Sequence, residues 1–130
     1  MRIWTVSLGV ALLCIVLSAC DGDDSPTAPD PPGGGQSGAT ITITSDGVSP
    51  EEVTIEVGQM VTFRNNDNTG HEMRSNPHPT HGQCPPINQV GELGAGQTKQ
   101  TGVFNSAMTC GFHDHDDASN ESLHGTITIR

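Results

Sequence analysis

From Ala39 onward, hydrophobic and polar residues alternate in short runs, and no run keeps the 3.6-residue period of an amphipathic helix. In the segment EVTIEV, Val53, Ile55 and Val57 fall on one side of an extended chain, which we expect to face the core, and Thr54 and Glu56 fall on the other, solvent-exposed side. Gly, Asn, Asp and Pro interrupt the runs, as is typical of turns between strands. The pattern predicts strands at residues 40–44, 52–57, 60–65, 71–75, 98–104, 108–112 and 125–130.

Seven or so strands in about ninety residues, joined by turn-rich connections, predict an all-β fold, a β-sandwich with Greek-key topology. Residues 75–91 contain four prolines, which exclude this segment from a central strand. We expect it to form a long loop that is ordered only if something fastens it.

The first nineteen residues have the features of a signal peptide. Arg2 supplies a positive charge, and the apolar segment VSLGVALLCIVL is too short to span a bilayer comfortably. The next motif, LSAC, resembles the lipobox of bacterial lipoproteins, which implies cleavage before Cys20 and attachment of lipid to its sulfur. The alternative is an ordinary secretory signal that leaves Cys20 free. Asp21, directly after the cysteine, resembles a signal that retains lipoproteins in the inner membrane of some Gram-negative bacteria, so the choice between inner and outer membrane stays open.

Residues 20–38 consist of Cys20 and a segment rich in Pro, Gly and Asp without a large apolar side chain. Such a segment cannot bury enough surface to offset the entropy of ordering, so it predicts a disordered tether. One small domain follows at 39–130. We therefore expect an exported protein that is anchored by lipid to a bacterial membrane, on its periplasmic or cell-surface side.

The predicted domain is acidic, with eleven Asp and Glu against four Lys and Arg. This balance argues against binding to nucleic acid and against electrostatic attachment to anionic lipid. Cations or basic proteins are the more suitable partners.

Two cysteines remain in the predicted domain, Cys84 in the Pro-rich loop and Cys110 in a predicted strand. Export to an oxidising compartment makes a disulfide between them the default. Cys110 shares a strand face with Phe112, so we expect it to point into the core and His113 to point the other way. Closing this loop would contribute about 3 kcal/mol in the chain-entropy model. The alternative is that Cys110 binds a metal as a thiolate.

All six histidines of the chain fall in two loop-rich regions, at 71–81 and 113–124. They are His71, His78, His81, His113, His115 and His124. Neutral imidazole is a good ligand for copper, zinc, nickel and iron. In an extended chain, the spacing of His113 and His115 places both rings on one side, where they can face one ion. The histidines therefore predict a metal site.

The order of motifs along 39–130 resembles that of the cupredoxins, the family of plastocyanin and azurin. The matching segments are EVTIEVGQMVTFRNNDNTGHEM, LGAGQTKQTGVF, MTCGFHDH and LHGTITI. Their anchor residues are Pro50, Val53, Gly58, Val61, Phe63, Asn65, His71, Gly96, Phe104, Gly125 and Ile127. The resemblance implies a cupredoxin-like β-sandwich that binds copper, with His71 as the first ligand.

The second half departs from the family's pattern. The spacing of Cys110 and His113 matches a blue copper centre with Cys110 as its thiolate. Counted forward from Phe104 or back from Gly125, however, the family's thiolate position falls on Asp114. This register favours a set without thiolate, namely His71, His113 and His115, with His81 or His78 as a fourth ligand. Such a set favours Cu(II) or Zn(II) over Cu(I).

Three functions are compatible with these features. The first is a membrane-tethered, cupredoxin-like protein that binds copper and serves in electron transfer or copper handling, with a periplasmic redox partner. The second is a copper- or zinc-dependent enzyme such as a superoxide dismutase, although no catalytic residues stand out beside the ligands. The third is a metal-free β-sandwich that binds another protein.

Overall fold

The computed structural model describes residues 36–130. The predicted signal peptide, the lipidation site Cys20 and most of the predicted tether lie outside the described residues. Within the described part, none of the helices has the length and apolar character needed to cross a membrane.

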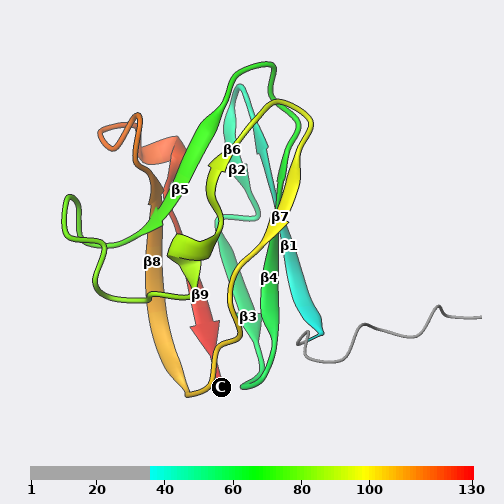
Figure 1. Ribbon diagram of the computed structural model, residues 1–130, viewed down its shortest axis with the longest axis vertical. Coiled ribbons are helices and arrows are strands. Elements are labelled where there is room, and N and C mark those ends of the chain that lie inside the picture. The colour runs from blue at the N-terminus through cyan, green and yellow to red at the C-terminus, as the bar shows by residue number, and fades with distance from the viewer. Residues whose placement is uncertain (1–35) are drawn as a thin grey trace, which may run out of the picture.

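The described chain is a β-sandwich of two mixed sheets (Figure 1). The first sheet has the order β2-β1-β4-β7, and the second has the order β3-β9-β8-β5-β6. The strands are β1 (Ser37–Thr44), β2 (Gly47–Ser49), β3 (Glu52–Ile55), β4 (Met60–Asn65), β5 (His71–Ser75), β6 (Gly91–Leu93), β7 (Thr98–Gln100), β8 (Met108–Asp114) and β9 (Gly125–Ile129). Two short 3-10 helices, η1 (Ile87–Gln89) and η2 (Glu121–Leu123), lie in the connections.

All seven predicted strands are present; β4 and β5 have the predicted ends, and the ends of the other five differ. The two strands that the pattern missed, β2 and β6, have three residues each, too few to show an alternation. β1 begins at Ser37, inside the segment predicted to be tether. β3 ends at Ile55, so Val57 is 47% exposed in the following turn instead of facing the core. β8 extends to Asp114 and thereby includes His113.

The core lies between the two sheets, and the three phenylalanines are among its largest buried side chains. Phe63 of β4 and Phe112 of β8 meet edge to face, with ring centroids 5.2 Å apart. Gly125 is required beside this contact, because a Cβ there would come within 2.3 Å of Cζ of Phe112. The aromatic pair therefore packs the first sheet against β8, the strand that also carries Cys110 and His113.

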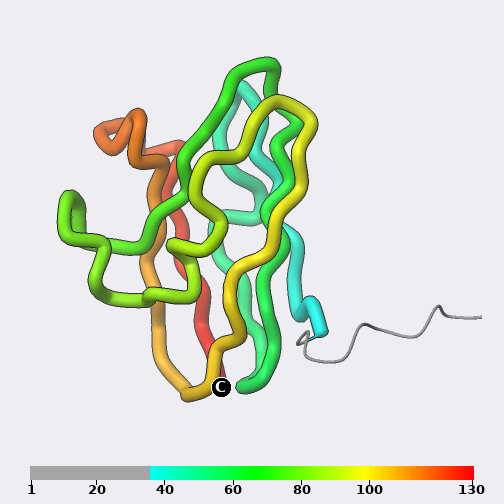
Figure 2. The backbone as a smooth tube through the Cα atoms, viewed as in Figure 1, coloured from blue at the N-terminus to red at the C-terminus, as the bar shows by residue number. Residues whose placement is uncertain are grey.

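The segment between β5 and β6 forms the predicted long loop, and it projects beside β8 (Figures 1 and 2). A disulfide between Cys84 and Cys110 fastens it, and both cysteines are fully buried. Cys110 points into the core with Phe112, as the strand parity predicts. The disulfide thus joins the loop covalently to β8, although the two cysteines are 26 residues apart in the sequence.

Replacement of both Cys84 and Cys110 by alanine should lower the free energy of unfolding by about 3 kcal/mol, because a 26-residue separation is no longer closed in the unfolded chain. Denaturant unfolding of the variant and of the wild type measures the difference. An unchanged unfolding midpoint would show that the disulfide does not stabilise the fold.

Candidate metal centre

The site is built on the antiparallel pairing of β5 and β8. Ser75, the last residue of β5, pairs with Phe112, so the chain that leaves β5 begins directly beside β8. Two hydrogen bonds continue this contact beyond the strand. The Asn76 N–H donates to the Gly111 carbonyl at 2.9 Å, and the Gly111 N–H donates to Oε1 of Gln83 at 3.0 Å. The first residues of the loop therefore lie against β8, whereas Cys84, Ile87 and Val90 further along the loop belong to the core.

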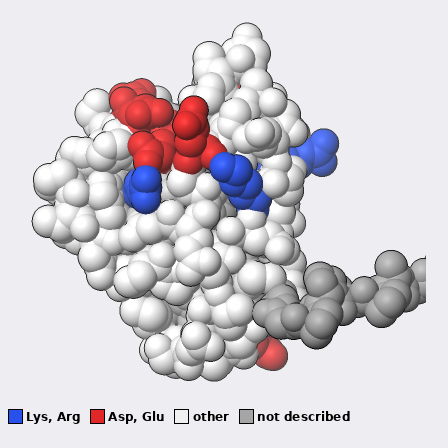
Figure 3. Space-filling model, in the orientation of Figure 1, with Lys and Arg blue, Asp and Glu red and all other residues white. Residues whose placement is uncertain are grey.

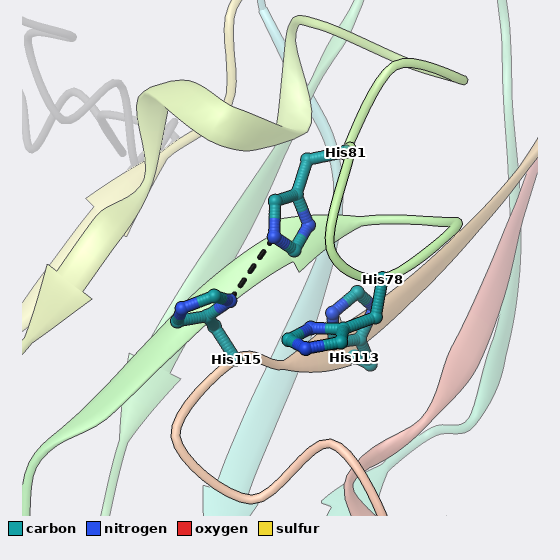
Figure 4. Close-up of side chains that lie close together, drawn as sticks. All are labelled: His78, His81, His113 and His115. Atoms are coloured by element: carbon teal, nitrogen blue, oxygen red, sulfur yellow. Dashed lines mark hydrogen bonds between the residues drawn. The ribbon is translucent and has the colours of Figure 1, made fainter.

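Four histidines meet where the loop covers the end of β8 (Figure 4). His78 and His81 come from the loop, His113 comes from β8, and His115 follows the end of that strand. One ring nitrogen of each lies within 4.8 Å of a ring nitrogen of every other. Ligands on opposite sides of an ion with bonds of about 2.0 Å lie about 4 Å apart. Four imidazoles at this spacing can surround one ion after a small contraction.

Hydrogen bonds assign the ring nitrogens of two of these histidines. Nδ1 of His113 lies 2.7 Å from Oδ1 of Asn76, and Nδ1 of His81 lies 3.0 Å from the Ser75 carbonyl oxygen. Both oxygens only accept, so both Nδ1 atoms carry the proton, and each neutral ring keeps a lone pair on Nε2. Metal-binding histidines commonly have their second nitrogen held in this way. Neither Asn76 nor Ser75 belongs to a sequence motif that predicts this role.

His113 carries the clearest sign of a missing ligand. Its side chain is 1% exposed, and among the described residues its Nε2 is the one buried side-chain nitrogen or oxygen without a hydrogen-bond partner. Burial, followed by repulsion from His81, His124, His78 and His115, lowers its pKa from 6.5 to about 4. The ring is therefore neutral at neutral pH, which is the state that binds a metal.

The backbone of His81 is held in an unusual conformation. Its φ of 51° lies in the left-handed region, where the described chain has no other residue except glycine. The His81 carbonyl accepts two hydrogen bonds of 2.7 Å, from Oγ of Ser75 and from Nδ2 of Asn88. Nε2 of His81 then lies 3.0 Å from Nδ1 of His115 (dashed in Figure 4). The loop is thus ordered in a conformation that turns the His81 ring toward the other imidazoles.

The loop between β5 and β6 has no formally charged side chain apart from its histidines. No Asp, Glu, Lys or Arg occurs at 75–91 or at 100–113, although the chain has a formal net charge of −10. On the face seen in Figure 3, acidic side chains gather above a surface that is mostly without charge. A cation would therefore be bound by neutral nitrogens within an acidic protein, whose long-range field favours its approach.

His71, which we expected to be the first ligand, lies outside this cluster. Its Nδ1 is 2.7 Å from Oδ2 of Asp114, and its Nε2 is 3.2 Å from Oδ2 of Asp67. A hydrogen bond from the Asn68 N–H, then one from Thr69, lowers the pKa of Asp67. Both ring nitrogens of His71 are thus used by carboxylates. Asp114 points opposite to His113 and His115 along the strand, so His71 and the cluster lie on different faces of β8.

His124, the remaining histidine, is not in the cluster either. Its Nε2 donates to the Ala118 carbonyl at 3.0 Å, and its ring centroid lies 5.9 Å from that of His113.

The possible thiolate ligand is also excluded by the structure. Cys110 is joined to Cys84, so its sulfur is not available as a thiolate. At the thiolate position that the cupredoxin register implies stands Asp114, whose Oδ1 accepts from the N–H groups of Glu72 and Asp116 at 3.0 and 3.1 Å. Together with the bond from His71, these contacts occupy the carboxylate. The residues at this position do not fit a blue copper centre.

Copper does fit the donor set of the four-histidine cluster. Imidazole nitrogens suit Cu(II), and tetragonal nitrogen sites are typical of Cu(II) and Ni(II). The orphaned Nε2 of His113 is the kind of buried polar atom that a bound ion would satisfy. The sequence prediction named all four residues, with His78 and His81 as alternatives for one place; the structure brings both of them to the cluster and leaves His71 out.

Comparison with solved structures identifies the class of fold. A purple cupredoxin from Nitrosopumilus maritimus superposes with a TM-score of 0.52 at 21% identity, covering 71% of this chain and 99% of that one. Oxidised plastocyanin from Dryopteris crassirhizoma gives 0.55 at 17% identity (70% and 99%), and reduced auracyanin from Roseiflexus castenholzii gives 0.52 at 19% identity (74% and 99%). No protein-family model matches the sequence, and no curated protein matches it significantly. The domain has the cupredoxin fold.

Acid should destabilise the metal-free protein through His113. The unfolded chain takes up this proton near pH 6.5, whereas the folded protein takes it up near pH 4, so the unfolded state binds more protons between these values. The free energy of unfolding should fall by up to about 3 kcal/mol as the pH drops through this window. Denaturant unfolding at a series of pH values measures it. His113→Gln should flatten this dependence, and an equally steep fall in that variant would contradict the assignment.

Proposed function

We propose that the protein binds one Cu(II) ion between His78, His81, His113 and His115. The observation that carries the proposal is the buried Nε2 of His113, which lacks a hydrogen-bond partner and belongs to a ring surrounded by three further imidazoles. An unsatisfied buried polar atom is costly, and a metal ion would remove that cost.

Cu(II) is the ion that the donor chemistry favours. Among divalent first-row metals, nitrogen ligands generally bind copper most tightly. The cluster offers no thiolate or thioether, the soft ligands that select Cu(I), because the nearby sulfurs of Cys84 and Cys110 form a disulfide. Zn(II), the other ion expected from the sequence, should bind more weakly and compete poorly.

Copper handling is the role that this ligand set supports best. Four imidazoles stabilise Cu(II) more than Cu(I), so such a site holds one oxidation state instead of easing exchange between two. Electron transfer is the second candidate, since bound copper would supply a one-electron couple. In its favour, a mutant of amicyanin with the same fold, 15% identical to this chain, is described in a Cu(I) form, and His78 is exposed.

The proposed cellular setting rests on the first 38 residues. We propose that the signal peptide is removed, that Cys20 is lipidated and that the following segment tethers the domain to a bacterial membrane. A tether would keep the metal site near the membrane while the domain stays in the aqueous phase of the compartment.

Titration of the purified protein with Cu(II) should show uptake of one ion per chain. The expected product has weak d–d absorption and an EPR spectrum of a type 2 centre with hyperfine splitting from several nitrogens, because all four ligands are imidazoles. An intense blue charge-transfer band would contradict the proposal, since it requires a thiolate ligand that the disulfide excludes.

Two variants serve as a matched pair for this titration. His81→Asn should lower copper affinity by more than the roughly 10–100-fold that loss of a hydrogen bond to a ligand costs, while asparagine tolerates the left-handed backbone at this position. His71→Gln should leave affinity close to wild type, because His71 is bonded to Asp67 and Asp114 on the other side of β8. The reverse result would restore His71 as a ligand.

Lipidation is tested separately by producing the full chain in a bacterium that processes lipoproteins. Mass spectrometry should find a mature N-terminus at Cys20 with attached acyl chains, and the Cys20→Ala variant should carry no acyl chains. A mature wild-type N-terminus without acyl chains, or one at a residue other than Cys20, would overturn the proposed anchor.

A further inference from the structure

Asn76 contacts His113 on the nitrogen that the metal would not use. Its Oδ1 lies 2.7 Å from Nδ1 of His113; His113 is buried, and Asn76 is half-buried. A neutral imidazole without a partner exchanges between two tautomers, and only the one with the proton on Nδ1 leaves the Nε2 lone pair free. An acceptor at Nδ1 therefore decides which nitrogen of His113 is available as a ligand.

The side chain of Asn76 is itself fixed against β8. Its backbone N–H donates to the Gly111 carbonyl at 2.9 Å, and its amide group lies directly over Gly111. A Cβ on Gly111 would come within 2.3 Å of Nδ2 and 3.1 Å of Cγ of Asn76. Glycine at 111 is therefore what allows the amide to reach along the strand to His113, two residues further on.

The ring of His81 is also held by a hydrogen bond, but its acceptor is a backbone carbonyl. His81 donates to the Ser75 carbonyl, a contact that comes with the course of the chain and does not depend on a particular side chain at position 75. The amide of Asn76 is different, because a substitution can remove the acceptor and leave the backbone in place. The tautomer of His113, and with it the nitrogen that is free to bind a metal, thus depends on one side chain that can be substituted.

We propose that Asn76 is a positioning residue of the copper site, which holds His113 as the Nδ1–H tautomer and so directs Nε2 to the metal. This inference rests on the proposed function and deepens it. Removing such a partner typically lowers metal affinity by roughly 10–100-fold.

The first measurement uses the metal-free protein, so that it does not depend on copper binding. Nitrogen-15 NMR of the imidazole rings at neutral pH should show His113 in the wild type with its proton on Nδ1. Asn76→Leu, which keeps the approximate shape but has no acceptor, should shift His113 to a mixture of tautomers. Asn76→Asp keeps an acceptor oxygen and should restore the Nδ1–H form.

The second measurement compares Cu(II) affinity in the same proteins by competition with a chelator. Asn76→Leu should bind roughly 10–100-fold more weakly than the wild type, and Asn76→Asp should recover most of the loss. Gly111→Ala should act like Asn76→Leu, because its Cβ displaces the amide. Gln83→Leu is the matched control: it removes another hydrogen bond between loop and β8 without touching a histidine, and should change neither tautomer nor affinity beyond threefold or so.

The outcomes separate the two proposals. A His113 ring with its proton on Nε2 in the wild type, or equal copper affinity in Asn76→Leu and wild type, overturns the role of Asn76 and leaves copper binding intact. Equal losses in Gln83→Leu and Asn76→Leu also overturn it, because they would reflect general loosening of the loop. Absence of copper uptake by the wild type overturns the proposed function itself, whatever tautomer His113 adopts.

Discussion

The four-histidine cluster depends on one covalent constraint, the disulfide between Cys84 and Cys110. The long loop after β5 has four prolines and no regular strand partner, so few backbone hydrogen bonds would hold it to the sandwich. The disulfide fastens it to β8, and the bonds of Asn76 and Gln83 to Gly111 then set its course. Because two histidines of the cluster come from the loop and two from the end of β8, the constraint that joins these segments also brings the four imidazoles together.

The two opposite faces of β8 carry different groups of polar side chains. On one face Asp114 accepts hydrogen bonds from His71 and from two backbone N–H groups, and it occupies the place where the family resemblance implies a copper thiolate. On the other face lie His113 and His115 beneath the loop. Adjacent residues of a strand point in opposite directions. Imidazoles at positions 113 and 115 therefore lie on one side of the sheet, and a ligand at position 114 would lie on the other. The domain thus has the cupredoxin fold, and its histidine cluster lies on the face of β8 opposite to Asp114.

Much of the fold could be predicted from local sequence. The alternation of apolar and polar residues located seven strands, and the parity of Cys110 with Phe112 correctly placed the cysteine in the core and His113 opposite to it. The short strands β2 and β6 were missed, because three residues carry no periodic signal. For the site, the spacing of His113 and His115 was informative, whereas the structure does not bring His71, the other expected ligand, to these two residues. One of its carboxylate partners, Asp114, is 43 residues away in the sequence. The other, Asp67, lies in the preceding turn, and no local pattern indicates that it bonds to the ring.

The sequence by itself determined an all-β domain, an oxidisable cysteine pair and a supply of imidazoles in two loop-rich regions, since these follow from side-chain chemistry and from the period of an extended chain. Only the tertiary structure decided which histidines meet. His78 and His81 come within reach of His113 and His115 through strand pairing, the disulfide and the left-handed backbone at His81. These are contacts between residues far apart in the chain, and their geometry depends on how the sheets pack, which no short stretch of sequence contains.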